Sequence, residues 1–216
     1  MSENQANKTQ IKIEKLFSKI VDKAKEFGLQ PKNDGRDIKE PKGNAIIRKN
    51  LGEAAFSDGT AYFGFIGKEE ETAGVYSDFS LVIFPEKELD YCVVALGVGS
   101  LGFKNDYNLA TLPGLRRQFL KLRVDDDTTF FKTSFDDIES TSSDLLKRIK
   151  ASFSELIQVI DRYKTVLPAS QIVDFSPSEE NALSILYRWV ALYAKVRGWP
   201  TNKTQRDALE KEIKNI

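Results

Sequence analysis

The chain has 216 residues, of which 41% are hydrophobic and 30% charged, enough for one medium-sized domain with a core and a well-solvated surface. Lysine plus arginine equals aspartate plus glutamate, 32 against 32, so nucleic-acid binding would need a local basic patch rather than a global field. The absence of histidine excludes a Ser-His-Asp or Cys-His catalytic centre and any His-ligated zinc or iron site.

The single cysteine, Cys92, excludes a disulfide within the chain and suits a reducing compartment. Residues 1–10 are polar and lack the hydrophobic core of a signal peptide. No apolar run in the sequence approaches the roughly 20 residues that span a bilayer. We therefore expect a cytoplasmic protein without membrane contact, in which residues 1–10 form a disordered tail.

The first ordered element that the pattern predicts is a helix over residues 13–27, followed by Gly28 as a stop signal. Its apolar residues recur at helical spacing: Ile13, Leu16, Phe17, Ile20, Val21, Ala24 and Phe27. Residues 30–44 contain prolines and glycines and few apolar side chains, which indicates an exposed loop.

A sheet follows, because the sequence is rich in β-branched and aromatic residues and is interrupted by turn signals. The predicted strands cover residues 45–51, 61–66, 75–84 and 89–98. The connections between the last three are too short for a parallel crossover, which needs a dozen or more residues. These strands are therefore expected to form an antiparallel meander.

The rest of the chain is predicted to be mainly helical. The expected elements are a helix at 113–123, an edge strand at 128–135, and helices at about 140–163, 176–198 and 201–216. The fold class is thus α/β of the α+β type: a mostly antiparallel sheet packed with helices, with a helical C-terminal segment. We divide the chain into an α/β domain at 11–175 and a helical C-terminal extension at 176–216.

Residues 97–102, Gly-Val-Gly-Ser-Leu-Gly, match the G-x-G-x-x-G pattern of dinucleotide-binding loops. That pattern needs a βαβ unit, whereas the strand here arrives through a hairpin and no long amphipathic helix follows before Pro113. We interpret these glycines as a turn leaving the sheet and expect no nucleotide cofactor.

Two acidic triplets, Asp125-Asp126-Asp127 and Glu69-Glu70-Glu71, are the candidates for cation binding. A hard cation needs oxygen ligands that converge from several positions, and three adjacent side chains point in different directions. Solvated loops are therefore the favoured interpretation, and no metal site is expected.

Two basic clusters flank the predicted sheet. Arg48 and Lys49 lie in the first strand, and Arg116 and Arg117 lie on the short helix that Pro113 begins. The unpaired backbone N–H groups at the start of such a helix favour a phosphate. The ordinary alternative for both clusters is a solvated charged face.

Tyr62 and Tyr76 lie near the ends of adjacent predicted strands, beside the hairpin loop that joins them. Aromatic rings in such a place can stack on a flat ligand, and stacking on a base contributes about 1–3 kcal/mol. The alternative is that both are ordinary strand tyrosines with a buried ring and a solvated hydroxyl.

Residues 61–99, AYFGFIGKEEETAGVY…LVIF…LDYCVVALGVG, resemble the N-terminal DNA-binding domain of McrB-type proteins, the specificity subunits of modified-cytosine restriction systems. The shared pattern begins with an aromatic pair and Phe-Ile-Gly at the end of one strand, followed by an acidic polar loop. Gly-Val-Tyr then begins the next strand, which leads into an aliphatic run, a charged turn and a strand ending in glycine.

The resemblance implies base flipping, in which a modified cytosine leaves the duplex and enters an aromatic pocket. Tyr62 and Tyr76 would form the walls of this pocket, and Leu81 would pack near the base. In that family a Gly-aromatic-Gly loop enters the duplex. The corresponding stretch here is LGEAAFSDG, in which Phe56 is the candidate residue.

Phosphate contacts from Arg48, Lys49, Arg116 and Arg117 would hold the duplex while the pocket reads the base. The expected function is that of a DNA-binding recognition module of a restriction or anti-phage defence protein, without enzymatic activity of its own. Its partners would be double-stranded DNA, plain or modified, and an effector subunit or fused ATPase outside these residues.

Two other function classes remain open on the sequence. One is a protein-interaction or sensor domain that recognises a phage component or a nucleotide signal, with the same patches serving that partner. The other is a magnesium-dependent enzyme that uses the acidic loops, because the lack of histidine leaves carboxylates, lysine and tyrosine for acid–base chemistry.

Overall fold

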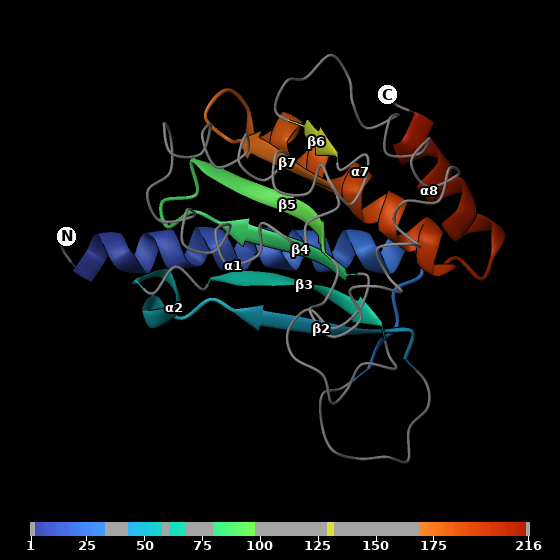
Figure 1. The fold of residues 1–216 in the computed structure, drawn as a ribbon, viewed down its shortest axis with the longest axis horizontal. Coiled ribbons are helices and arrows are strands. Elements are labelled where there is room, and N and C mark those ends of the chain that lie inside the picture. The colour runs from blue at the N-terminus through green and yellow to red at the C-terminus, as the bar shows by residue number, and fades with distance from the viewer. Residues whose placement is uncertain are drawn as a thin grey trace.

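The computed structural model describes residues 3–32, 43–57, 61–67, 80–97, 129–131 and 169–214. Over these ranges the fold is mixed α/β, with a twisted sheet and helices packed against one of its faces (Figure 1). The predicted fold class is confirmed. None of the helices in the described ranges is long and apolar enough to cross a membrane.

The sheet has seven strands in the order β1-β2-β3-β4-β5-β7-β6. Their bounds are Pro31–Lys32 (β1), Ala45–Asn50 (β2), Tyr62–Gly67 (β3), Ser80–Pro85 (β4), Tyr91–Gly97 (β5), Thr129–Phe131 (β6) and Ala169–Asp174 (β7). Neighbouring strands are antiparallel except β1 and β2, which are parallel. The predicted meander is therefore confirmed from β3 to β5, and β2 extends it.

The helices are α1 (Glu3–Glu26), α2 (Glu53–Ser57), α7 (Glu179–Arg197) and α8 (Lys203–Lys214). Ser178 caps α7, because its Oγ accepts a hydrogen bond from the Asn181 backbone N–H at 3.3 Å. Gly198 ends the helix with a φ of 67°, a left-handed conformation that glycine adopts without strain.

Helix α1 begins at Glu3, so residues 3–10, which the sequence assigns to a disordered tail, are helical. These residues contain Glu, Gln, Ala and Lys and neither Pro nor Gly, a composition that continues a helix without needing burial. The strand β6 falls inside the predicted segment 128–135 and lies at the edge of the sheet, as expected. The expected helices at 113–123 and 140–163 lie outside the described residues.

The strand β7 is not predicted from the sequence, although it pairs with β5 over six residues and with β6 over three. Its sequence, Ala-Ser-Gln-Ile-Val-Asp, is short and half polar. The polar members have structural roles that the pattern does not reveal. Ser170 and Gln171 are both buried, and Gln171 accepts a hydrogen bond from the Trp189 indole N–H.

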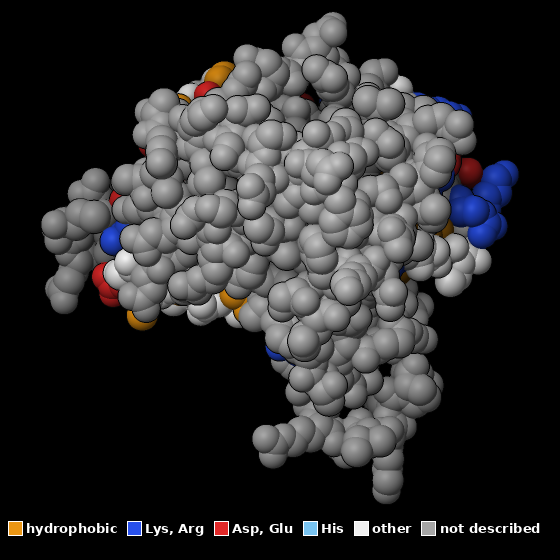
Figure 2. All heavy atoms as spheres, viewed as in Figure 1, with side chains coloured by type: hydrophobic (Ala, Val, Ile, Leu, Met, Phe, Trp, Pro, Cys, Tyr) orange, Lys and Arg blue, Asp and Glu red, His pale blue; other side chains and the backbone are white. Residues whose placement is uncertain are grey.

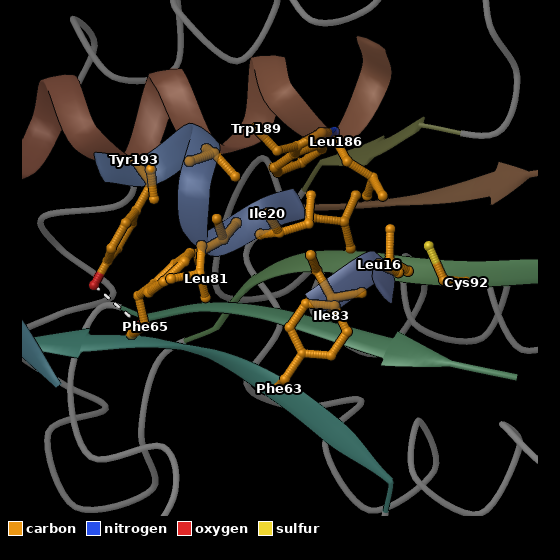
Figure 3. Close-up of a cluster of buried hydrophobic side chains, with 14 of the residues drawn as sticks. Leu16, Ile20, Phe63, Phe65, Leu81, Ile83, Cys92, Leu186, Trp189 and Tyr193 are labelled. Carbon is orange, nitrogen blue, oxygen red and sulfur yellow. Dashed lines mark hydrogen bonds between the residues drawn. The ribbon is translucent and has the colours of Figure 1, made fainter. Parts of the chain in front are cut away.

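The main core lies between the sheet and helices α1 and α7. Alternate residues of the strands point to these helices, among them Phe63, Phe65, Leu81, Ile83 and Cys92 (Figure 3). Leu16 and Ile20 of α1, with Leu186, Trp189 and Tyr193 of α7, fill the other side. Burying each large apolar side chain here contributes about 1.5–3 kcal/mol relative to leaving it in water.

The opposite face of the sheet is apolar as well. Its residues are those that alternate with the helix-facing ones: Ile46, Ile66, Val82, Phe84, Val93 and Ala95, all buried. Strands that are apolar on both faces read as continuous hydrophobic runs rather than as alternating patterns. Hence the sequence alone does not show which side of each strand faces the helices.

Helices α7 and α8, which the sequence assigns to a C-terminal extension, contribute to the same core. The Tyr193 hydroxyl donates a hydrogen bond to the Phe65 carbonyl at 3.2 Å and accepts one from Arg197 Nε at 3.1 Å. Trp199, in the loop between the two helices, packs edge-on against Phe65 and Tyr193. The C-terminal helices are therefore anchored directly to the sheet.

Candidate nucleic-acid interface

Tyr62 begins β3 and is half-buried. It pairs in register with Asn50 of β2, and its neighbour Phe63 points into the helix-side core. Because side chains alternate along a strand, Tyr62 lies on the face of the sheet that is turned away from α1 and α7.

Arg48 shares this face with Tyr62. It lies two residues before Asn50 on β2 and pairs in register with Gly64, two residues after Tyr62 on β3. Its side chain is half-buried, and the guanidinium Nε is buried without a hydrogen-bond partner among the described residues. No carboxylate in the described part of the chain forms an ion pair with it. Burying a cation without a partner is unfavourable, so this site would be stabilised by an anion.

Lys49, the next residue, has a different environment. Its Nζ lies 3.0 Å from Glu14 Oε2 and 3.2 Å from Glu14 Oε1, and 4.7 Å from the centroid of the Phe17 ring. Both partners are on α1, so the Lys49 side chain is on the helix side of the sheet. Arg48 and Lys49, which the sequence groups as one basic cluster, thus lie on opposite faces, and Lys49 is neutralised by Glu14.

Leu81 and Phe56 are in the hydrophobic core. Leu81 pairs in register with Phe65, and both side chains face α1 and α7 (Figure 3). The exposed fraction is 0% for Leu81 and 5% for Phe56 on α2. Leu81 therefore lies on the opposite side of the sheet from Tyr62, and neither residue presents its side chain at the surface.

The remaining predicted site residues, Tyr76, Arg116 and Arg117, lie outside the described residues, and their roles stay predictions. The same holds for both acidic triplets and for Gly99 to Gly102 of the glycine-rich segment. Within the described ranges, no group of acidic or cysteine side chains is arranged to hold a metal ion.

A basic surface that the sequence analysis did not single out lies on α8. Lys203, Arg206, Lys211 and Lys214 of this helix are all exposed. Figure 2 shows blue side chains gathered at the edge of the molecule where α8 lies in Figure 1. The sequence does predict a polar helix at 201–216. Its cations could have been recognised as one exposed face if Leu209 had been identified as the buried side of that helix.

A shallow groove of about 510 Å³ lies between helices α1, α7 and α8. It is lined by Lys19, Glu179, Glu180, Leu183, Ser184, Tyr187 and Glu212. Lys19 Nζ lies 2.6 Å from Glu179 Oε1 across its rim. Because α1 is distant in the chain from α7 and α8, no local sequence pattern predicts this groove.

Lys23 of α1 connects the same three helices, because it contacts Tyr187 of α7 and Glu212 of α8, two residues that line the groove. Its Nζ lies 3.0 Å from Glu26 Oε2, 3.2 Å from Glu212 Oε2 and 5.1 Å from the centroid of the Tyr187 ring. Burial alone lowers the pKa of Lys23, but hydrogen bonds and charge interactions with the two glutamates outweigh it and raise the pKa. Burial also raises the pKa of the Tyr187 hydroxyl, although Lys19 and Lys23 oppose the shift.

Comparison with known proteins returned no match at any level: no family model, no curated protein and no solved structure matches this chain.

Proposed function

We propose that this domain is a DNA-binding recognition module of a restriction or anti-phage defence protein that acts in the cytoplasm. It would read a modified cytosine by flipping the base into an aromatic pocket that includes Tyr62 and Tyr76. The proposal rests on the resemblance of residues 61–99 to the McrB-type DNA-binding domain and on the surroundings of Arg48.

The observation that carries the proposal is the placement of Arg48 beside Tyr62 on one face of the sheet. The Arg48 guanidinium has a buried Nε and pairs with no carboxylate among the described residues. A phosphate oxygen is a suitable partner, because arginine binds phosphates through charge-assisted hydrogen bonds. A half-exposed aromatic ring next to such a cation suits a nucleotide, which offers a phosphate and a flat base together.

In this mechanism the two residues have different tasks. Arg48 holds a backbone phosphate and contributes to affinity for any sequence, whereas Tyr62 contacts the flipped base by stacking. Tyr76 is proposed as the second wall of the pocket, and Arg116 and Arg117 as further phosphate contacts. Lys49 is a weaker candidate for a phosphate contact, because Glu14 already neutralises its charge.

A second candidate function is a protein-interaction or sensor domain. It is favoured by the pairing of Lys49 with Glu14 and by the burial of Leu81 and Phe56, which leave fewer of the predicted residues for DNA. In that case Arg48, which pairs with no carboxylate in the described ranges, would receive a carboxylate or a phosphate of a protein or signalling nucleotide.

The experiment that tests the proposal is a binding panel of duplexes that differ only in one cytosine: plain, methylated or hydroxymethylated. Each duplex is titrated at about 50 mM and about 200 mM salt, because phosphate contacts make affinity fall steeply with salt. We expect tighter binding of one modified duplex and at least a tenfold loss for Tyr76→Ala, if stacking contributes its usual 1–3 kcal/mol.

Salt-insensitive binding, or a failure to bind plain and modified duplexes alike, would contradict the proposal. If instead a nucleotide or a protein binds and Arg48→Ala abolishes that binding, the second candidate is supported.

A further inference from the structure

The described part of the chain carries its positive charge unevenly, although the whole chain is neutral. In α8 and the last residues of α7 the basic side chains are Lys195, Arg197, Lys203, Arg206, Lys211 and Lys214. The acidic residues of the same segments are Asp207, Glu210 and Glu212, and Glu212 already pairs with Lys23 of α1. Six positive charges against three negative charges leave a local excess of three.

Four of these cations have no acidic partner among the described residues. Lys203, Arg206, Lys211 and Lys214 are exposed and take part in none of the ion pairs formed there, whereas Lys195 Nζ lies 2.8 Å from Glu210 Oε1. By comparison, Lys19, Lys23 and Lys25 of α1 each pair with a carboxylate, whereas Lys12 and Lys15 of that helix are exposed and take part in none of the ion pairs of the described residues. Cations that are not paired are the ones that can exchange their counterions for a polyanion.

The helix presents these cations to solvent because its other side is committed to packing. Leu209 is buried against the rest of the protein, and Ala208 and Ile213 pack against the same core. From Lys203 to Lys214 the helix rises about 16 Å, at about 1.5 Å per residue. On a duplex that length corresponds to about five phosphates of one strand.

We infer that the exposed face of α8, formed by Lys203, Arg206, Lys211 and Lys214, is a second contact surface for the phosphate backbone of double-stranded DNA. The inference rests on the proposed function, since DNA is the anionic polymer that the domain is proposed to bind. This surface is separate from Arg48 and Tyr62, because α8 packs on α7 and α1 and those residues lie on the other face of the sheet. It would bind duplex of any sequence.

The test is the salt dependence of binding to a plain duplex of about 30 base pairs, measured by fluorescence anisotropy between about 50 and 200 mM salt. Each phosphate contact that is lost lowers the slope of log K against log salt by about 0.9. We expect the slope to fall by about 1 to 2 in Lys203→Gln/Arg206→Gln and again in Lys211→Gln/Lys214→Gln. All four positions are exposed, so the variants should fold as the unmodified protein does.

The matched control is Lys12→Gln/Lys15→Gln, which removes the same charge from exposed positions of α1. If this control lowers the slope as much as the α8 variants do, the effect is one of net charge and the inference is wrong. An unchanged slope in both α8 variants overturns it as well. If the α8 surface binds an acidic protein instead of DNA, the salt slope of DNA binding would likewise be unchanged in both α8 variants.

The two proposals fail in different ways. If α8 is not a DNA contact, its variants bind like the unmodified protein while Arg48→Ala and the choice of cytosine still change affinity. If the base-reading proposal is wrong but α8 binds DNA, the salt slope depends on α8 while plain and modified duplexes bind equally. Absence of all duplex binding contradicts both.

Discussion

The indole N–H of Trp189 donates a hydrogen bond to Gln171 Oε1 at 2.8 Å in the interior of the protein. The exposed fraction is 0% for Trp189 and 4% for Gln171. This bond joins α7 to β7, the two elements that bring the C-terminal part of the chain into the core.

Replacing Gln171 with leucine removes the acceptor and leaves the indole N–H buried without a partner. We expect Gln171→Leu to lower the free energy of unfolding by about 1–3 kcal/mol, measured by urea denaturation. Adding Trp189→Phe removes the donor as well, so the double variant should lose less than the sum of the two single losses. Additive losses would mean that the bond contributes nothing of its own.

A substitution at Gly64 tests how closely the backbones of β3 and β4 approach each other. A Cβ at this position would lie 2.1 Å from the Leu81 carbonyl oxygen, and backbone atoms cannot move aside cheaply. We expect Gly64→Ala to lower the free energy of unfolding by about 3 kcal/mol or more. The control is Gly52→Ala, where a Cβ would have nothing within 4 Å and the change should stay within about 1 kcal/mol of neutral. Equal effects of the two substitutions would contradict the close approach.

Arg48 and Lys49 form a matched pair of cations on opposite faces of one strand. We expect Arg48→Ala to weaken DNA binding and to lower the slope of log K against log salt by about 1, because a phosphate contact is lost. Lys49→Ala should leave the slope nearly unchanged and lower the stability by about 0.5–1 kcal/mol, because it removes the Glu14 ion pair and the Phe17 contact. The reverse order of effects on DNA binding would assign the phosphate contact to Lys49.

The raised pKa values of Lys23 and Tyr187 predict that the folded protein loses stability at alkaline pH. Both groups have a pKa that is raised in the folded state, so the folded protein holds these protons more tightly than the unfolded chain does. Their contribution is complete below the ordinary values of 10.5 for Lys23 and 10.0 for Tyr187, and it is lost as the pH rises above them.

We therefore expect the midpoint of urea unfolding to fall as the pH rises above the ordinary values of 10.0 and 10.5, and to fall less in Lys23→Met and Tyr187→Phe. At neutral pH, Lys23→Met should cost about 1 kcal/mol, since its ion pairs are partly solvated. Lys25→Met is the control, because Lys25 is exposed and its one ion pair within the described residues is with Asp22, one turn away. The same alkaline loss in every variant would place its origin in other groups.

The fold class and most element positions follow from the sequence, because apolar spacing and turn signals are local. The strands predicted at 45–51 and 61–66 agree with the bounds of β2 and β3 to within one residue. The sequence did not predict β7, since its polar residues Ser170 and Gln171 become buried only through partners that are distant in the chain. The prediction does not include the start of α1, because residues 3–10 have no hydrophobic periodicity that could mark a helix.

The candidate site was harder to predict than the fold. The sequence grouped Arg48 with Lys49 and placed Leu81 near Tyr62, and both statements depend on which face of the sheet each residue occupies. Strand alternation separates neighbours, but it does not tell which face receives α1 and α7 when both faces are apolar. The basic face of α8 became visible only once Leu209 was known to be its buried side.

The position of β7 between β5 and β6 has a consequence for synthesis of the protein. Tyr91 of β5 pairs with Asp174 of β7, 83 positions later in the chain. The edge of β5 that faces away from β4 therefore lacks its partner strand β7 until the ribosome has made residues 169–174. Until then the nascent chain has an unpaired strand edge flanked by apolar side chains, and such an edge can pair with another chain and aggregate. We therefore expect chaperones that cover this edge during synthesis to raise the yield of folded protein in a host cell.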